Sequence, residues 1–198
     1  KMEIYLMFLQ HIVASMDAKG HAAMVVPTGF LTAKGKIPMK IRKKMVDSKM
    51  LRGVVSMPSN IFANTGTNVS IVFLDASVEH DHALLMDASK LGEKRKVDGK
   101  NQRTFLSADE IERIVQTFNA DEELDGLSVQ ASYEDIAAKK FSFSAGQYFE
   151  VRIEYVDLTP EEFDAELSER MATLEKLFTE GARLQSEIKA QLKKVRLG

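Results

Sequence analysis

Hydrophobic and polar positions along the first 75 residues predict helices and buried strands in turn. Residues 3–17 place apolar side chains at helical spacing, and Gly20 follows as a glycine often does after a helix. Three short apolar segments are typical of buried strands: residues 22–26, 54–57 and 68–74. Residues 39–48 predict a helix between the first two of these strands. Because a helix between strands indicates a βαβ crossover, we expect an α/β fold: the second half of an open, mostly parallel sheet.

The pattern after residue 75 predicts a strand, a loop and then mainly helices. Residues 83–88 are expected to form a strand at the sheet edge, and the Gly- and Lys-rich residues 90–102 are expected to form a loop. Residues 141–156 alternate and are rich in aromatics, which favours an extended, packed segment. Three hydroxyl caps precede an acid by three residues and predict helix starts: Ser107 with Glu110, Ser132 with Asp135, and Thr159 with Glu162.

The clearest predicted element is a long amphipathic helix from Pro160 to about Val195. Its apolar positions recur every three or four residues, and they include Leu174, Leu177, Leu184, Ile188 and Leu192. Such a helix would run roughly 50 Å, and its stripe is narrow enough for a coiled-coil seam. Two interpretations stay open at this point, because the stripe could dock a partner or pack along its own domain. We divide the chain into residues 1–106, a linking region of residues 107–158, and residues 159–198.

Composition narrows the classes of function. The 198 residues are 44% hydrophobic, which is enough to bury a core, and they contain no Cys and four His. This composition excludes disulfides, thiolate metal sites and a cysteine nucleophile, and it favours a reducing cytoplasm. We expect no metal site, because His80 and His82 flank Asp81 in a polar loop without a further ligand. No apolar run approaches the ~20 residues that cross a bilayer, so we expect no membrane insertion.

A net charge of −2 conceals a basic front and an acidic middle of the chain. Two clusters concentrate the positive charge: Lys34, Lys36, Lys40, Arg42, Lys43 and Lys44, and then Lys90, Lys94, Arg95, Lys96, Lys100 and Arg103. Clusters of this kind can neutralise phosphates of a nucleic acid, although a cluster taken alone is more often a solvated surface.

Four segments, in this order and spacing, resemble the carboxyl-terminal half of the modification (methyltransferase) subunits of type I restriction-modification systems. They are residues 8–31 (FLQHIVASMDAKGHAAMVVPTGFL), 41–75 (ending SNIFANTGTNVSIVFLD), 84–115 (LLMDASKLGEKRKVDGKNQRTFLSADEIERIV) and 141–151 (FSFSAGQYFEV). The resemblance implies an adenine-specific DNA methyltransferase that uses S-adenosylmethionine. It also implies assembly with a specificity subunit that selects the DNA and with a restriction subunit.

The same resemblance implies roles for individual residues. An enzyme that modifies the 6-amino group of adenine must extrude the base and stack it on an aromatic side chain, and the matching position is Phe62. Ordinary core packing is the alternative for Phe62. The loop of Asn64, Thr65 and Gly66 could contact the flipped nucleotide, although turn chemistry alone would also explain it. Pro27, Thr28, Gly29 and Phe30 follow the neighbouring strand and would line the same crevice. The candidate phosphate contacts come from the first basic cluster: Lys34, Lys36, Arg42, Lys43 and Lys44. The final helix matches the part of the family that docks the specificity subunit.

Two motifs of the family are missing from this sequence: a glycine-rich cofactor loop and an Asn-Pro-Pro-aromatic motif. We therefore assign no catalytic residue to the chain and place the cofactor contacts mostly outside it. We expect it to be the rear portion of a larger subunit and inactive by itself. The alternative is a non-catalytic nucleic-acid-binding or scaffold module whose final helix docks a partner.

Overall fold

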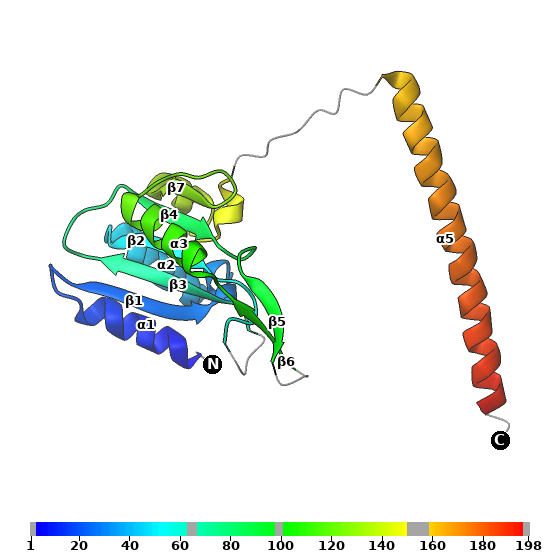
Figure 1. Ribbon diagram of the computed structural model, residues 1–198. Helices are drawn as coiled ribbons and strands as arrows, with labels where there is room; N and C mark the ends of the chain where they lie inside the picture. The colour runs from blue at the N-terminus through cyan, green and yellow to red at the C-terminus, as the bar shows by residue number, and fades with distance from the viewer. Residues whose placement is uncertain (1–2, 63–66, 98–100, 150–158, 196–198) are drawn as a thin grey trace. The chain divides into compact units, whose positions relative to one another are not determined.

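The computed structural model describes residues 3–62, 67–97, 101–149 and 159–195 (Figure 1). The chain divides into two compact units, residues 1–150 and residues 151–198. The first unit is an α/β domain, and the described part of the second is one helix. None of the described helices combines the length and apolar character that crossing a membrane requires.

The helices and strands of the first unit follow in the order α1 (Ile4–Ser15), β1 (His21–Pro27), η1 (Thr28–Leu31), α2 (Lys36–Asp47), β2 (Leu51–Ser56), β3 (Val69–Asp75), β4 (His82–Asp87), β5 (Glu93–Val97), β6 (Asn101–Phe105), α3 (Ala108–Ala120), β7 (Ser128–Ser132), α4 (Tyr133–Ala138) and η2 (Ala145–Gln147). The second unit holds α5 (Pro160–Val195).

The main sheet is mixed, so the expectation of a mostly parallel sheet is wrong. Its strand order is β1-β3-β2-β4-β7, and among these strands only β2 and β4 pair in parallel. The crossover through α2 does make β1 and β2 run in the same direction. However, β3 returns between them and pairs antiparallel with both. A crossover pattern fixes the direction of the strands it joins, but it does not reveal a strand that is inserted between them.

Two further expectations about the sheet are corrected by the structure. β4 lies between β2 and β7 instead of at an edge, because the later strand β7 covers it. The expected loop of residues 90–102 contains β5, which pairs antiparallel with β6 in a separate two-stranded sheet. Its strands carry charged and polar side chains on both faces, so the alternation that marks a half-buried strand is missing.

The two faces of the main sheet pack against different helices. Val54, Val72 and Leu85 belong to a core cluster that includes residues of α1, α2 and α4. Val55 and Leu84, on the other face, pack with side chains of α3. Gly53 allows both β4 and α3 to approach closely, since a Cβ at this position would lie 2.5 Å from the carbonyl oxygen of Leu84 in β4 and 2.8 Å from the ring of Phe118 in α3. This packing fixes the ends of the strands, where the candidate site lies.

Candidate functional site

One end of the main sheet collects the carboxyl ends of β1, β2 and β4 and the start of β3. Backbone hydrogen bonds join these ends, from the N–H of Thr28 to the carbonyl of Asn68 (2.8 Å) and from the N–H of Ala88 to the carbonyl of Ser56 (2.9 Å). We call this end of the sheet the carboxyl rim. Ligands of open α/β sheets usually bind outside the carboxyl ends of the strands, which makes the rim the candidate binding site.

A row of hydroxyl groups fixes the strand ends at the rim. The hydroxyls of Thr28 and Ser70 lie 3.0 Å apart, and the Ser70 hydroxyl lies 3.4 Å from that of Ser56. Ser70 is fully buried, so its polar group needs these partners. The row therefore links η1, β3 and β2 side chain to side chain at the carboxyl rim.

Phe62 lies in the segment between β2 and β3 at the carboxyl rim. Its side chain is 47% exposed, which is more than a ring packed into the core would be. The turn before it is held by Thr104, whose hydroxyl donates to the carbonyl of Ser59 (2.6 Å) and whose N–H donates to that of Asn60 (3.1 Å). The backbone leading to Phe62 is thus anchored while the ring is accessible. Its expected loop partners Asn64, Thr65 and Gly66 lie outside the described residues.

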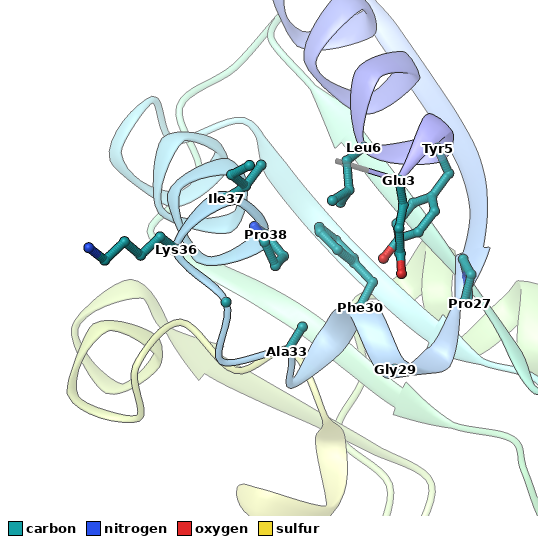
Figure 2. Close-up of a pocket in the computed structure, with 11 residues that line it drawn as sticks. Glu3, Tyr5, Leu6, Pro27, Gly29, Phe30, Ala33, Lys36, Ile37 and Pro38 are labelled. Carbon is teal, nitrogen blue, oxygen red and sulfur yellow. The ribbon is translucent and has the colours of Figure 1, made fainter. Parts of the chain in front are cut away.

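The expected crevice-lining residues span the end of β1 and the start of η1, and three of the four line a cavity of about 650 Å³. Figure 2 shows Pro27, Gly29 and Phe30 beside the first residues of α1 and α2. Thr28 is absent from this wall and belongs to the hydroxyl row instead. Phe30 is fully buried and meets Tyr5 edge to face, with ring centroids 6.1 Å apart, so only part of its surface can face the cavity.

Three polar side chains are among the residues that line this cavity. Glu3, Tyr5 and Lys36 line it together with mostly apolar side chains. Burial, followed by the hydrogen bond and the negative charge of Glu3, raises the pKa of Tyr5 to about 12. At neutral pH the phenol is therefore a neutral hydrogen-bonding group. The cavity is a mainly apolar recess with one carboxylate and one ammonium group among its lining residues.

The expected phosphate-binding residues do not form one surface. Lys34 and Lys36 are exposed where η1 leads into α2, next to the carboxyl rim. Lys43 and Lys44 are also exposed, but they lie about 10 Å further along the helix axis. Lys43 forms an ion pair with Asp47 at 2.8 Å. Lys34 and Lys36 are therefore the members of the set that the fold brings to the rim.

Arg42 does not belong to this surface, and a phosphate contact for it is ruled out by its burial. Its guanidinium is 1% exposed and donates to the carbonyls of Phe30 (2.5 Å), Ala33 (2.7 Å) and Phe141 (2.6 Å). Burial lowers the pKa of Arg42 to about 10, which leaves the group protonated at neutral pH. Arg42 therefore joins the turn after η1 to the segment after α4. The sequence places it in a basic cluster, but α2 turns its side chain inward.

The opposite end of the sheet carries a cluster of ionisable groups that ties α3 to the strands. His82 contacts Asp121 at 2.7 Å, and the same Asp accepts a hydrogen bond from Arg52 at 2.8 Å. Burial lowers the pKa of His82, but its hydrogen bonds to Asp121 and Asp81 outweigh burial and raise the pKa overall. No group of three possible metal ligands occurs in the described part of the chain. The cluster is an ion-paired junction at the end of α3.

In the second unit, α5 begins with the expected cap. The hydroxyl of Thr159 accepts a hydrogen bond from the N–H of Glu162, and the Glu162 carboxylate accepts one from the N–H of Thr159. The five expected docking residues are between 45% and 64% exposed: Leu174, Leu177, Leu184, Ile188 and Leu192. A single helix cannot bury its own apolar stripe, so this surface is suited to pairing with another element.

The hairpin of β5 and β6 contacts the rim, and the sequence pattern did not predict it. Thr104 of β6 is the residue that holds the turn before Phe62, and its contacts join segments 45 positions apart. The dipeptide Asp98-Gly99 between two short polar segments is a hairpin signal that could have located it.

Comparisons with known proteins agree on one family. The profile of the N-6 DNA Methylase family matches residues 1–155. The HindI type I restriction enzyme methylase subunit of Haemophilus influenzae is 26% identical over 192 residues, or 93% of this chain and 42% of the relative. The MpnII type I restriction enzyme methylase subunit of Mycoplasma pneumoniae is 30% identical over 154 residues, or 77% of this chain and 27% of the relative. The chain thus spans less than half the length of these curated relatives.

Solved structures agree with this match at the level of the fold. A type I restriction-modification methyltransferase subunit from Streptococcus thermophilus superposes with a TM-score of 0.66 at 24% identity, covering 75% of this chain and 31% of that one. A structure on complex assembly and conformational transition of the type I restriction-modification system gives a TM-score of 0.55 at 18% identity, covering 92% and 39%.

Proposed function

Because the chain belongs to the N-6 DNA methylase family, we propose that it forms part of an adenine-specific DNA methyltransferase whose carboxyl rim holds the extruded adenine. The methyl donor of the proposed reaction is S-adenosylmethionine. The observation that carries the proposal is the half-exposed ring of Phe62 on an anchored turn at this rim. Relatives that are methylase subunits of type I restriction enzymes support the same assignment.

The role of Phe62 follows from the chemistry of the substrate. The 6-amino group of adenine cannot be reached inside the duplex, so the base must leave the stack at a cost of a few kcal/mol. An accessible aromatic ring recovers part of this cost by stacking on the extruded base, which contributes about 1–3 kcal/mol. In this proposal Phe62 supplies one wall of the pocket, and the loop of Asn64, Thr65 and Gly66 supplies polar contacts.

The described residues do not make a complete cofactor site. The cavity beside η1 has mainly apolar walls, and the sequence contains no glycine-rich loop that would bring backbone N–H groups against a ligand. We therefore assign the contacts to S-adenosylmethionine mostly to residues outside this chain. It follows that the chain by itself should not methylate DNA, whereas the complete product of its gene should.

Three variants of Phe62 in the complete gene product test the base pocket. Phe62→Ala should lower methylation, measured as kcat/KM with tritiated cofactor, by roughly 5- to 150-fold if one stack is lost. Phe62→Tyr keeps a stacking face and should stay close to the parent. Phe62→Leu keeps apolar volume without a ring, so it should resemble Phe62→Ala if the ring stacks on a base. Parent-like activity of Phe62→Leu would show that packing is the role of this side chain.

We further propose that α5 docks the specificity subunit of the same restriction-modification system through its apolar stripe, in a complex that also includes the restriction subunit. The exposed stripe of α5 supports this assignment. Leu184→Glu with Ile188→Glu should abolish co-purification with the specificity subunit, because two carboxylates would be buried in a coiled-coil seam. Gln185→Glu with Lys189→Glu adds the same two side chains beside the stripe and serves as the control. Retention of the complex by the first variant would refute the assignment.

Measurements of DNA binding and methyl transfer by the complete gene product distinguish the methyltransferase from the alternative, a non-catalytic module. If the complete gene product, assembled with its partner subunits, binds DNA but transfers no methyl group with Phe62 intact, the methyltransferase proposal fails and a scaffold or nucleic-acid-binding role takes its place.

A further inference from the structure

The hairpin of β5 and β6 carries positive charge that the fold does not neutralise. Residues 93–105 contain five basic and two acidic residues. The side chains of Lys94, Arg95 and Lys96 are all exposed. Glu93 forms an ion pair with Arg95 at 2.6 Å, whereas among the described residues Lys94 and Lys96 have no acidic partner. The strand β5 thus carries three exposed cations, Lys94 and Lys96 on one face and Arg95 on the other.

The two strands of the hairpin also place like charges opposite each other. Arg95 pairs in register with Arg103, and like charges directly across an antiparallel pair are destabilising. Both guanidinium groups lie over the ring of Phe105, at 5.8 Å and 5.3 Å from its centroid. The Nε atom of Arg103 is buried without a hydrogen-bond partner among the described residues. An anion bound at this surface would relieve the repulsion between the two arginines.

The hairpin has a fixed attachment to the carboxyl rim. Thr104 binds the carbonyls of Ser59 and Asn60, which precede Phe62 by three and two residues. At its base, the N–H of Gly92 donates to the carboxylate of Glu110 in α3 (2.8 Å). In Figure 1 the hairpin projects from the end of the sheet to which the β4 arrow points. Its cations are therefore held beside the segment that presents Phe62.

The charge at the rim is distributed on both sides of this segment. Lys34 and Lys36 follow β1, at one edge of the sheet, whereas the hairpin follows β4, on the other side of β3 and β2. A nucleotide extruded from a duplex is flanked by phosphates on both sides of the gap. The ring of Phe62, with cations on either side of it, fits that arrangement of charge. Contacts from such cations to phosphates would position the duplex without reading its sequence.

We propose that the hairpin of β5 and β6 is a DNA-backbone arm, in which Lys94, Arg95 and Lys96 contact phosphates of the duplex next to the extruded base. This inference rests on the proposed function, since it takes duplex DNA as the ligand of the rim. The arm contributes to DNA binding through its charge and holds the duplex against the pocket. Another part of the assembly selects the DNA sequence.

The salt dependence of DNA binding by the complete gene product, with its partner subunits, tests the arm. Each phosphate contact contributes about 0.9 to the slope of log affinity against log salt concentration. Lys94→Gln with Lys96→Gln should therefore lower the slope by about 1.8, which corresponds to as much as about 60-fold weaker binding at 0.1 M salt. Arg95→Gln should lower it by about 0.9. The probe is a 30-base-pair duplex, measured by fluorescence anisotropy between 50 and 300 mM salt.

Two controls separate the arm from general charge and from folding. Lys19→Gln with Lys49→Gln removes two exposed lysines that precede β1 and β2, at the other end of the sheet, and should leave the slope unchanged. Lys94→Arg with Lys96→Arg retains the charge and should retain the slope. An unchanged slope in the Lys94 and Lys96 glutamine variant refutes the arm while the proposed function stands. A parent that neither binds nor methylates DNA refutes the proposed function itself.

Discussion

Replacement of Arg42 by Met should destabilise the first unit strongly. Arg42→Met keeps an unbranched side chain but removes the three donors that satisfy the carbonyls of Phe30, Ala33 and Phe141. A hydrogen bond from a charged group contributes about 1.5–3 kcal/mol. Because Met also removes the cost of burying a guanidinium, the lower end applies, and three lost bonds sum to roughly 4 kcal/mol.

The assay for this prediction is thermal unfolding of the complete gene product by differential scanning calorimetry. For a unit of about 150 residues, 1 kcal/mol corresponds to about 2–4 °C, so Tm should fall by roughly 10 °C. Lys43→Met changes the adjacent, exposed residue and should shift Tm by no more than about 2 °C, because its ion pair with Asp47 is exposed. Below its own Tm, Arg42→Met should keep the salt slope of DNA binding.

Equal Tm values for Arg42→Met and Lys43→Met would refute the structural role of Arg42. A lower salt slope in folded Arg42→Met would instead return this residue to the phosphate-binding set, and it would contradict the burial of its guanidinium.

Three further predictions concern the frame of the sheet. Because the pKa of His82 is raised in the folded state, its contribution to stability is present below the unfolded pKa and is lost as pH rises through the folded pKa. The Tm of the protein should therefore fall over that pH window, and His82→Gln should reduce this fall. Thermal melts at a series of pH values check both results. Ser107→Ala should cost about 1 kcal/mol in urea unfolding by removing the cap of α3, and a cost near zero would contradict the capping box. Gly53→Ala should cost about 1–3 kcal/mol, since the added Cβ meets the carbonyl oxygen of Leu84 at 2.5 Å and the ring of Phe118 at 2.8 Å. An unchanged unfolding midpoint would contradict the close approach of β4 and α3 to this position.

Local elements of the fold could be predicted from the sequence because local patterns determine them. The first helix and the first three strands were expected within a few residues of their observed bounds, and the caps at Ser107, Ser132 and Thr159 form as predicted. Each of these features depends on residues close together in the chain.

Features that depend on distant residues were not predictable in the same way. The insertion of β3 between β1 and β2 depends on pairing across the sheet. The spacing of apolar residues indicates helices and strands but does not indicate which strands pair. The inward orientation of Arg42 depends on carbonyls as far away as Phe141, so its sequence neighbours suggested a surface role instead. The sequence of the hairpin of β5 and β6 does not alternate between apolar and polar residues, so no pattern predicts a buried face. The hairpin is held in place by single residues such as Thr104.

In the candidate site, too, some features could be predicted from the sequence, and those that depend on distant residues could not. The sequence, through its resemblance to a known family, indicated Phe62 and the segment after β1, and the structure places both at the carboxyl rim. It did not indicate the hydroxyl row centred on Ser70 or the anchoring of the Phe62 segment by Thr104. Both features join residues that are far apart in the chain and meet only in the folded domain.

Photocrosslinking of the target position to the protein tests the central claim most directly. The methylated adenine is first located by sequencing DNA modified by the complete enzyme, and 5-iodouracil is then placed at that position of a duplex. Irradiation of the assembled complex, followed by mass spectrometry of the peptides, should give a crosslink at Phe62 that Phe62→Ala abolishes. A crosslink that maps elsewhere with the same yield in parent and Phe62→Ala would contradict the claim that this rim holds the extruded base.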